Sequence, residues 1–162
     1  MRLLLVSDLH YSLPLFDWVA EVAANFDVVV MAGDHLDLAS LVDGRAQVTV
    51  VRKDFDRIRA KTRLLICSCN HDLDSKNEAG EWTARWLLGR RNDGVLSDGE
   101  STKIGDILFT VCPWWDGPVS QAEIGRQLAT AAKDRRGRWI WLYHAPPSKS
   151  PIAWSGQRYF GD

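Results

Sequence analysis

The chain has 162 residues, 46% of them hydrophobic and 25% charged, which is the balance of a globular domain with a sizeable core. The formal net charge of −1 gives no electrostatic reason to expect a nucleic-acid partner, although it does not exclude one. No apolar stretch is long enough to cross a bilayer, and the first residues lack the long apolar region of a secretory signal. We therefore predict a cytoplasmic protein with no membrane partner.

The first half of the chain alternates short apolar runs with segments of helical periodicity. The run around Val28–Val30 is typical of a strand that is covered on both faces. Pro14 suits the first turn of a helix, and an apolar stripe follows it at helical spacing. The predicted elements are a strand over Arg2–Val6, a helix that begins near Pro14, a strand over Asp27–Met31, a helix over Leu38–Lys61, a strand over Arg63–Cys67 and a helix over Glu78–Leu88.

The second half adds antiparallel strands to this pattern. A Gly-Asp pair separates Ser101–Ile104 from Ile107–Val111, which is typical of a two-residue hairpin turn. Ser120 and the Glu three residues later have the spacing of a capping box, so we expect a helix to begin there. Arg138–Leu142 is the last predicted strand. No repeat or linker divides the sequence, so we predict one mixed α/β domain over residues 1–162.

The tryptophans lead to three packing predictions. Trp139 and Trp141 alternate on the last strand, so we expect both to pack on one face of the sheet. Trp82 and Trp86 are four residues apart, which predicts a helical stripe facing the core. The loop Pro113–Pro118 holds two tryptophans between prolines, and these rings would either wall a substrate pocket or simply pack over the hairpin.

Three cysteines, Cys67, Cys69 and Cys112, cannot all pair within the chain. One residue separates Cys67 from Cys69, which fits neither the usual zinc-finger spacing nor a redox Cys-x-x-Cys pair. We interpret all three as small apolar packing residues in a reducing compartment. A functional thiol is the alternative.

Residues that can ligate metals follow four apolar runs, at the points where strands are expected to end. In open α/β sheets the ligand site lies beyond the carboxyl ends of the strands. Convergence of these ends would bring two carboxylates, an amide oxygen and two imidazoles together, a donor set that suits a metal site. The stretches are Asp8-Leu9-His10, Gly33-Asp34-His35-Leu36-Asp37, Asn70-His71-Asp72 and Tyr143-His144-Ala145.

The first two stretches supply carboxylates and an imidazole. In an extended segment Asp8 and His10 would point the same way and could hold one ion. Asp34 follows a glycine that permits a tight turn, and its two oxygens make it the natural bridge between two ions. Asp37 would either orient a ligand histidine or act as a helix N-cap.

The other two stretches supply an amide, two imidazoles and a further carboxylate. Asn70 would bind through its neutral amide oxygen, and His144 would add a nitrogen ligand. His71 could bond a phosphate oxygen or protonate a departing alkoxide, and Asp72 would hold that imidazole and raise its pKa.

Taken in order, these motifs resemble those of the calcineurin-like metallophosphoesterase family, and the resemblance runs from Asp8 to His144. It implies a β-sandwich of two mixed sheets flanked by helices. It also implies a dinuclear centre, and the mixed oxygen and imidazole donors suit Mn, Fe or Zn better than Ca. A hydroxide that bridges the ions would attack phosphorus in line with the leaving oxygen, with His71 as general acid paired with Asp72. The implied ligands are Asp8, His10 and Asp34 for the first ion, and Asp34, Asn70 and His144 for the second.

The sequence departs from the family pattern at two places. Cys69 stands where the family usually has glycine, so this turn must either avoid positive φ or be strained. The family normally continues after the lone histidine to a Gly-His-x-His segment, but no histidine follows His144. The segment Trp154–Asp162 resembles the loop that would lead to it. We therefore expect a domain that is incomplete at its C-terminus, with weakened metal retention and self-association through an exposed sheet edge.

The favoured interpretation is an enzyme, a metal-dependent phosphoesterase acting as a phosphatase or a phosphodiesterase. The near-neutral charge and the aromatic loop favour a small diester or a nucleotide as substrate. The alternative is a catalytically weak or inactive scaffold of the same fold that binds partner proteins. Retention of His71 with Asp72 favours the enzyme, whereas the absent final histidines favour the scaffold.

Overall fold

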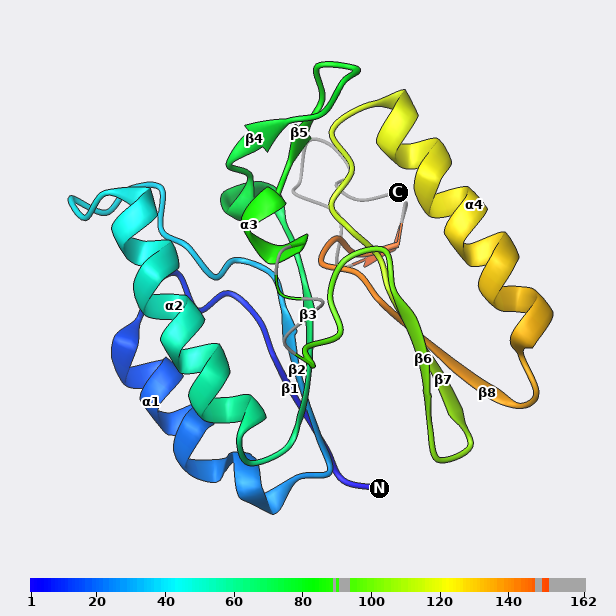
Figure 1. The fold of residues 1–162 in the computed structure, drawn as a ribbon, viewed down its shortest axis with the longest axis horizontal. Helices are drawn as coiled ribbons and strands as arrows, with labels where there is room; N and C mark the ends of the chain where they lie inside the picture. Colours follow the sequence, from blue (N-terminus) through cyan, green and yellow to red (C-terminus); the bar gives the residue numbers. More distant parts are fainter. Residues whose placement is uncertain (89, 91–93, 148–149, 152–162) are drawn as a thin grey trace.

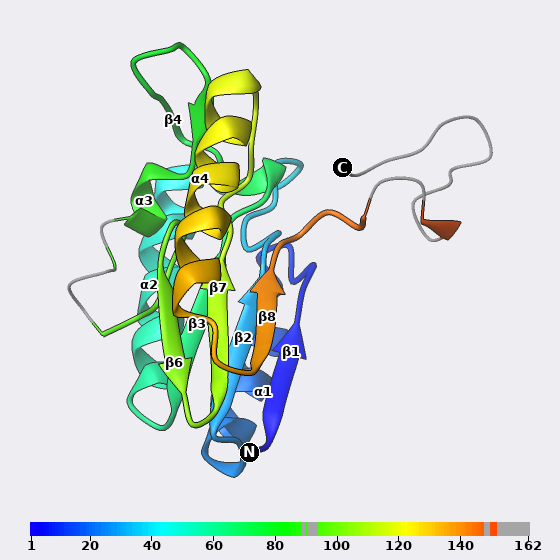
Figure 2. The same cartoon turned by 90° about the vertical axis from the view of Figure 1, so that its right-hand side faces the viewer.

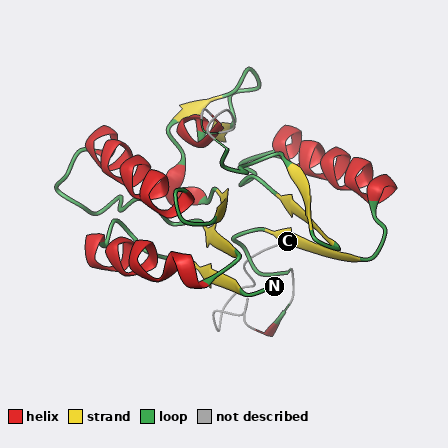
Figure 3. Ribbon diagram, turned by 60° about the horizontal axis from the view of Figure 1, so that its bottom comes forward, coloured by secondary structure: helices red, strands yellow, loops and turns green. Residues whose placement is uncertain are grey.

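Two three-stranded sheets pack face to face, with helices on both outer sides (Figure 1). The computed structural model describes residues 1–88, 90, 94–147 and 150–151. Two helices, α1 and α2, cover the outer face of the first sheet, and α4 lies beside the second (Figures 1 and 3). The helices are α1 (Leu13–Val22), α2 (Gly44–Arg59), α3 (Arg85–Leu88) and α4 (Pro118–Asp134), with 3₁₀ turns η1 (Ala23–Asn25) and η2 (Asn70–Asp72).

The first sheet is parallel, in the order β1-β2-β3, and its strands are β1 (Leu3–Val6), β2 (Val28–Ala32) and β3 (Arg63–Cys67). Side chains alternate between its two faces. Val29 and Met31 pack toward α1 and α2, whereas Val28 and Val30 pack against the second sheet. Both faces of β2 are thus apolar, which explains its continuous run of β-branched residues.

The second sheet is mixed, as predicted, and its strands are β6 (Ser101–Ile104), β7 (Ile107–Val111) and β8 (Arg138–Leu142). β6 and β7 form the predicted hairpin, and Gly105 in its turn has φ +61°. β8 pairs with β7 in parallel. The carboxyl end of β8 lies at the same end of the molecule as those of β1 and β2 (Figure 2). The predicted α/β sandwich is confirmed.

The predicted helix over Glu78–Leu88 is wrong for most of its length. A two-stranded hairpin, β4 (Ser75–Lys76) and β5 (Trp82–Thr83), precedes the short α3. The side chain of Asn77 accepts the backbone N–H groups of Ala79 and Glu81, and this local turn competes with a helix. Trp82 therefore lies exposed on β5, and only Trp86 of the predicted pair is buried.

Helix α4 begins at Pro118, two residues before the predicted start. Proline suits the first helical turn because it has no N–H to leave unpaired. The Glu81 carboxylate, from the loop between β4 and β5, accepts the backbone N–H groups of Val119 (2.8 Å) and Ser120 (2.7 Å). A distant acid thus caps this helix in place of the predicted local box. Helix α2 is also shorter than predicted, because Asp43 caps it through the N–H of Arg45.

Within the described residues β1 and β8 each pair on one side only. Trp139 and Trp141 meet edge to face at 5.0 Å between ring centroids, as expected for one face of β8, but Trp141 is 55% exposed. Every described helix is too short or too polar to reach across a bilayer.

Because edge strands pair readily with other chains, we predict self-association, and we expect Trp141→Lys to weaken it by adding a charge to the edge. Trp18→Lys is the matched control, since Trp18 is similarly exposed but lies on α1. Sedimentation velocity over a range of concentrations measures the effect. A wild-type chain that stays monomeric throughout would contradict the prediction.

Candidate metal centre

The loops that follow β1 and β2 are joined by backbone hydrogen bonds that continue the pairing of the two strands. The N–H of Asp8 donates to Gly33 O (3.3 Å), that of His10 to Asp34 O (2.8 Å) and that of Tyr11 to His35 O (3.0 Å). Asp8, His10, Tyr11 and Asp34 all have positive φ, between 42° and 58°. This conformation costs a non-glycine residue about 1–3 kcal/mol, and such strain concentrates at functional sites.

The carboxylate of Asp72 joins the loop after β2 to η2. It is fully buried and accepts the backbone N–H groups of His35 (3.0 Å), Leu36 (3.3 Å) and Cys69 (3.1 Å). The predicted pairing of Asp72 with His71 is therefore wrong in this structure. Adjacent residues of a helical turn point in different directions, so Asp72 faces the core and not the His71 ring.

Gly33 is the point at which three loops come closest. Its φ is +82°, and a Cβ there would lie 2.7 Å from both Cys69 Cβ and His144 Nδ1. Only glycine allows the loops after β3 and β8 to approach the end of β2 this closely.

We predict that Gly33→Ala destabilises the fold by at least about 2 kcal/mol more than Gly80→Ala. Both glycines have positive φ, +82° and +80°, so alanine is strained at either position, but nothing lies within 4 Å of the Gly80 position. Urea unfolding of both variants tests this difference. If both variants lose the same free energy of unfolding, the close contacts around Gly33 do not contribute to stability.

One group of candidate ligands consists of His10, Asp34 and His71, whose ligand atoms all lie within 4.8 Å of one another. His10 Nε2 is 3.3 Å from Asp34 Oδ2, and the rings of His10 and His71 meet at 4.9 Å in an edge-on arrangement. The buried Nδ1 of His71 has no hydrogen-bond partner among the described residues.

A second group consists of Asp34, Cys69 and His144, again within 4.8 Å. His144 Nδ1 lies 2.7 Å from the carbonyl oxygen of Ala32, and its Nε2 is 3.7 Å from Asp34 Oδ2. A carbonyl oxygen can only accept, so Nδ1 carries a proton, and Nε2, the nitrogen left for a metal, faces Asp34. This is the arrangement that metal-binding histidines adopt. Asp34, 5% exposed, belongs to both groups, as a bridging carboxylate would.

Of the predicted ligands, Asp8 lies outside both of these groups of histidine, cysteine and acidic side chains, and Asn70 would add an amide oxygen from the residue next to Cys69. Both are exposed, Asp8 after β1 and Asn70 at the start of η2. The expectation that Asp8 and His10 share a face assumed an extended segment. Both residues have left-handed backbone conformations, so the alternation of a strand does not apply to them.

Asp37 takes neither of its two predicted roles. Its Oδ1 accepts the N–H of Ala39 at 2.8 Å and closes a turn within its own loop, whereas Asp43 caps α2. His35 is a core residue, fully buried, with Nε2 3.1 Å from the carbonyl oxygen of Cys67.

Cys69 is a functional candidate that the sequence pattern indicated as a packing residue, with a functional thiol only as the alternative. Its backbone is extended, with φ −139°, so the turn avoids the strain expected where glycine is usual. Its thiol donates to Asp34 Oδ1, and burial, with the Asp72 and Asp34 carboxylates nearby, raises its pKa. Cys67 and Cys112 are buried packing residues, as predicted.

Trp114, from the loop Pro113–Pro118, packs beside the second group. Its ring stacks on Tyr143 with centroids 6.2 Å apart and approaches His144 edge-on at 6.2 Å. Its backbone N–H donates to Ser68 Oγ (2.9 Å), which ties this loop to the loop after β3. The ring thus packs against a candidate ligand and its neighbour Tyr143.

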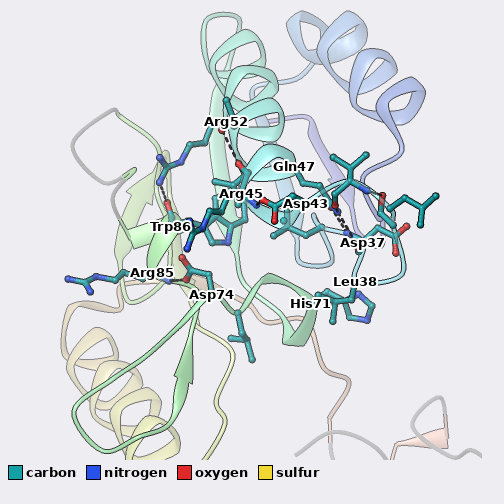
Figure 4. Close-up of a pocket in the computed structure, with 18 residues that line it drawn as sticks. Asp37, Leu38, Asp43, Arg45, Gln47, Arg52, His71, Asp74, Arg85 and Trp86 are labelled. Carbon is teal, nitrogen blue, oxygen red and sulfur yellow. Dashed lines mark hydrogen bonds between the residues drawn. The ribbon is translucent and has the colours of Figure 1, made fainter.

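A cavity of about 980 Å³ opens beside the first group (Figure 4). His71 lies at one end of it, and Arg85 and Trp86 lie toward the other (Figure 4). The exposed side chains of Leu38 and Leu41 line its rim. His71 is therefore both a member of a candidate ligand group and part of the cavity wall.

The family model for calcineurin-like phosphoesterases matches residues 1–153 of the chain. The chain belongs to this family. No curated protein matches it. Family membership indicates a phosphoesterase-type hydrolase, and proteins of this family typically bind divalent metals. The polar cluster around Asp34 offers two groups of candidate ligands.

Proposed function

We propose that the protein hydrolyses a small phosphoester with two divalent ions held around Asp34. The observation that carries the proposal is the position of His71, which lies between the candidate ligands and the cavity. His10 and Asp34 would hold one ion, and Asp34 and His144 the other. Asp8 and Asn70 stay predicted ligands, on the family resemblance alone.

The residues present fit such ions. Asp34 offers two oxygens, and His144 turns Nε2 toward Asp34 while Nδ1 is engaged by the carbonyl oxygen of Ala32. Oxygen and imidazole donors together suit Mn²⁺, Fe²⁺/Fe³⁺ or Zn²⁺ better than Ca²⁺. When bound, the ions would supply an attacking hydroxide and neutralise the charge that develops on the phosphoryl oxygens.

The chain's own part in the reaction is proton transfer and positioning. His71 would donate a proton to the leaving alkoxide, which would lie on the cavity side of the ring. Asp72 would act through the backbone, because it holds the Gly33–Leu36 loop and η2 in place. It is therefore a positioning residue and not the orienting partner of His71.

The cavity indicates the substrate class. Its wall contains three arginines and three aspartates, so its charge is balanced and a small leaving group with little net charge would fit it: Arg45, Arg52, Arg85, Asp37, Asp43 and Asp74. We propose a nucleotide or a small phosphodiester. A cytoplasmic location stays a prediction that no feature of the site tests.

We predict that His71→Ala lowers kcat about 10²–10⁴-fold while bound metal is retained, because the variant loses a proton donor. Asp34→Asn should lose at least about tenfold in metal affinity, and activity with it. Aryl phosphate mono- and diesters with Mn²⁺ in excess, together with metal analysis, measure both effects. Asp106→Asn is the control for Asp34→Asn, since Asp106 lies in the β6–β7 turn.

Activity that survives both substitutions would overturn the enzyme proposal. Absence of activity in the wild type with Mn²⁺ in excess would favour the partner-binding scaffold. One observation already favours the scaffold, since Asp8 lies outside both ligand groups.

A further inference from the structure

The sulfur of Cys69 makes three polar contacts, and Cys69 belongs to neither of the two apolar core clusters of the described residues. It accepts the backbone N–H groups of Asp34 (2.8 Å) and His71 (3.2 Å), and its S–H donates to the Asp34 carboxylate. The side chain is fully buried. A packing cysteine would contact apolar side chains, as Cys67 does in the core between the sheets.

We propose that Cys69 is a thiolate ligand of the ion held by Asp34 and His144, which makes this position selective for Zn²⁺ over Mn²⁺. The inference rests on the proposed function only in that it needs an ion to be held there. It adds a sulfur donor and a metal preference that the family resemblance does not supply.

The distances fit a tetrahedral ion. With Zn–S near 2.3 Å and Zn–N and Zn–O near 2.0–2.1 Å, neighbouring ligand atoms are about 3.3–3.6 Å apart. His144 Nε2 and Asp34 Oδ2 are already 3.7 Å apart, and all ligand atoms of the group lie within 4.8 Å. Small side-chain shifts would bring the three donors onto one ion.

The hydrogen bonds around the sulfur also fit a thiolate. The S–H proton lies between Cys69 and Asp34, two prospective anionic ligands, and binding of the ion would release it to solvent. The two backbone N–H groups would continue to donate to the sulfur after the proton has left. They would stabilise its negative charge without competing for the ion.

Sulfur changes which ions the site prefers. A soft thiolate selects Zn²⁺ over Mn²⁺ and Mg²⁺, whereas carboxylate and imidazole alone discriminate less. A second imidazole in place of the Cys69 thiolate would also complete the ion's coordination, but it would not favour Zn²⁺ over Mn²⁺. Cys69 caps the start of η2 with an extended backbone, so the chain supplies this sulfur donor without backbone strain.

The test is Co²⁺ titration of the metal-free protein, because a thiolate ligand gives a near-ultraviolet charge-transfer band that oxygen and nitrogen donors do not. We expect the band in the wild type, its loss in Cys69→Ser and its retention in Cys112→Ser, another buried cysteine. Cys69→Ser should also weaken Zn²⁺ binding about 10–100-fold and leave Mn²⁺ binding nearly unchanged.

The outcomes separate this inference from the proposed function. Co²⁺ bound in equilibrium dialysis without the band overturns the role of Cys69 and leaves the phosphoesterase proposal standing. Failure to bind any Co²⁺, Zn²⁺ or Mn²⁺ overturns both. If Cys69→Ser does not fold, X-ray absorption at the zinc edge of the wild type decides, with one sulfur near 2.3 Å expected.

Discussion

The buried carboxylate of Asp72 is the constraint on which the polar centre depends. It accepts three backbone N–H groups, two from the loop after β2 and one from Cys69, so movement of either loop would take hydrogen bonds away from a fully buried carboxylate. The penalty for this is several kcal/mol. Asp34 and Cys69 lie in the segments fixed in this way, and their contact follows from the same bonds. The Asp72 side chain, which is not itself a candidate metal ligand, thus determines where Asp34 and Cys69 lie.

Crowding around Gly33 is the second constraint, and it accounts for the strained backbone nearby. The loops after β1, β2, β3 and β8 reach one small volume, and four non-glycine residues there have positive φ. A free peptide would not keep these conformations. The apolar layers on both faces of β2 stabilise the sheet to which the loops are attached, and cross-loop hydrogen bonds hold the loops in place.

Much of the fold could be predicted from the sequence, because apolar runs and turn residues act locally. Arg63–Cys67, Arg138–Leu142 and the hairpin at Gly105 lie where the patterns indicate. The segment around Asn77 was mispredicted because side chains bond its backbone and override helical spacing. At the site, His10, Asp34, His71 and His144 come together, but Cys69 could not be identified in advance. Its sulfur contacts Asp34, 35 residues earlier, and only the fold creates that contact.

The position of His144 has a mechanical consequence. It follows β8 of the second sheet, yet its ring is hydrogen-bonded to Ala32 and faces Asp34 at the end of β2 in the first. Elsewhere the two sheets meet through closely packed apolar side chains. A cation shared by Asp34 and His144 would lock the two layers in register.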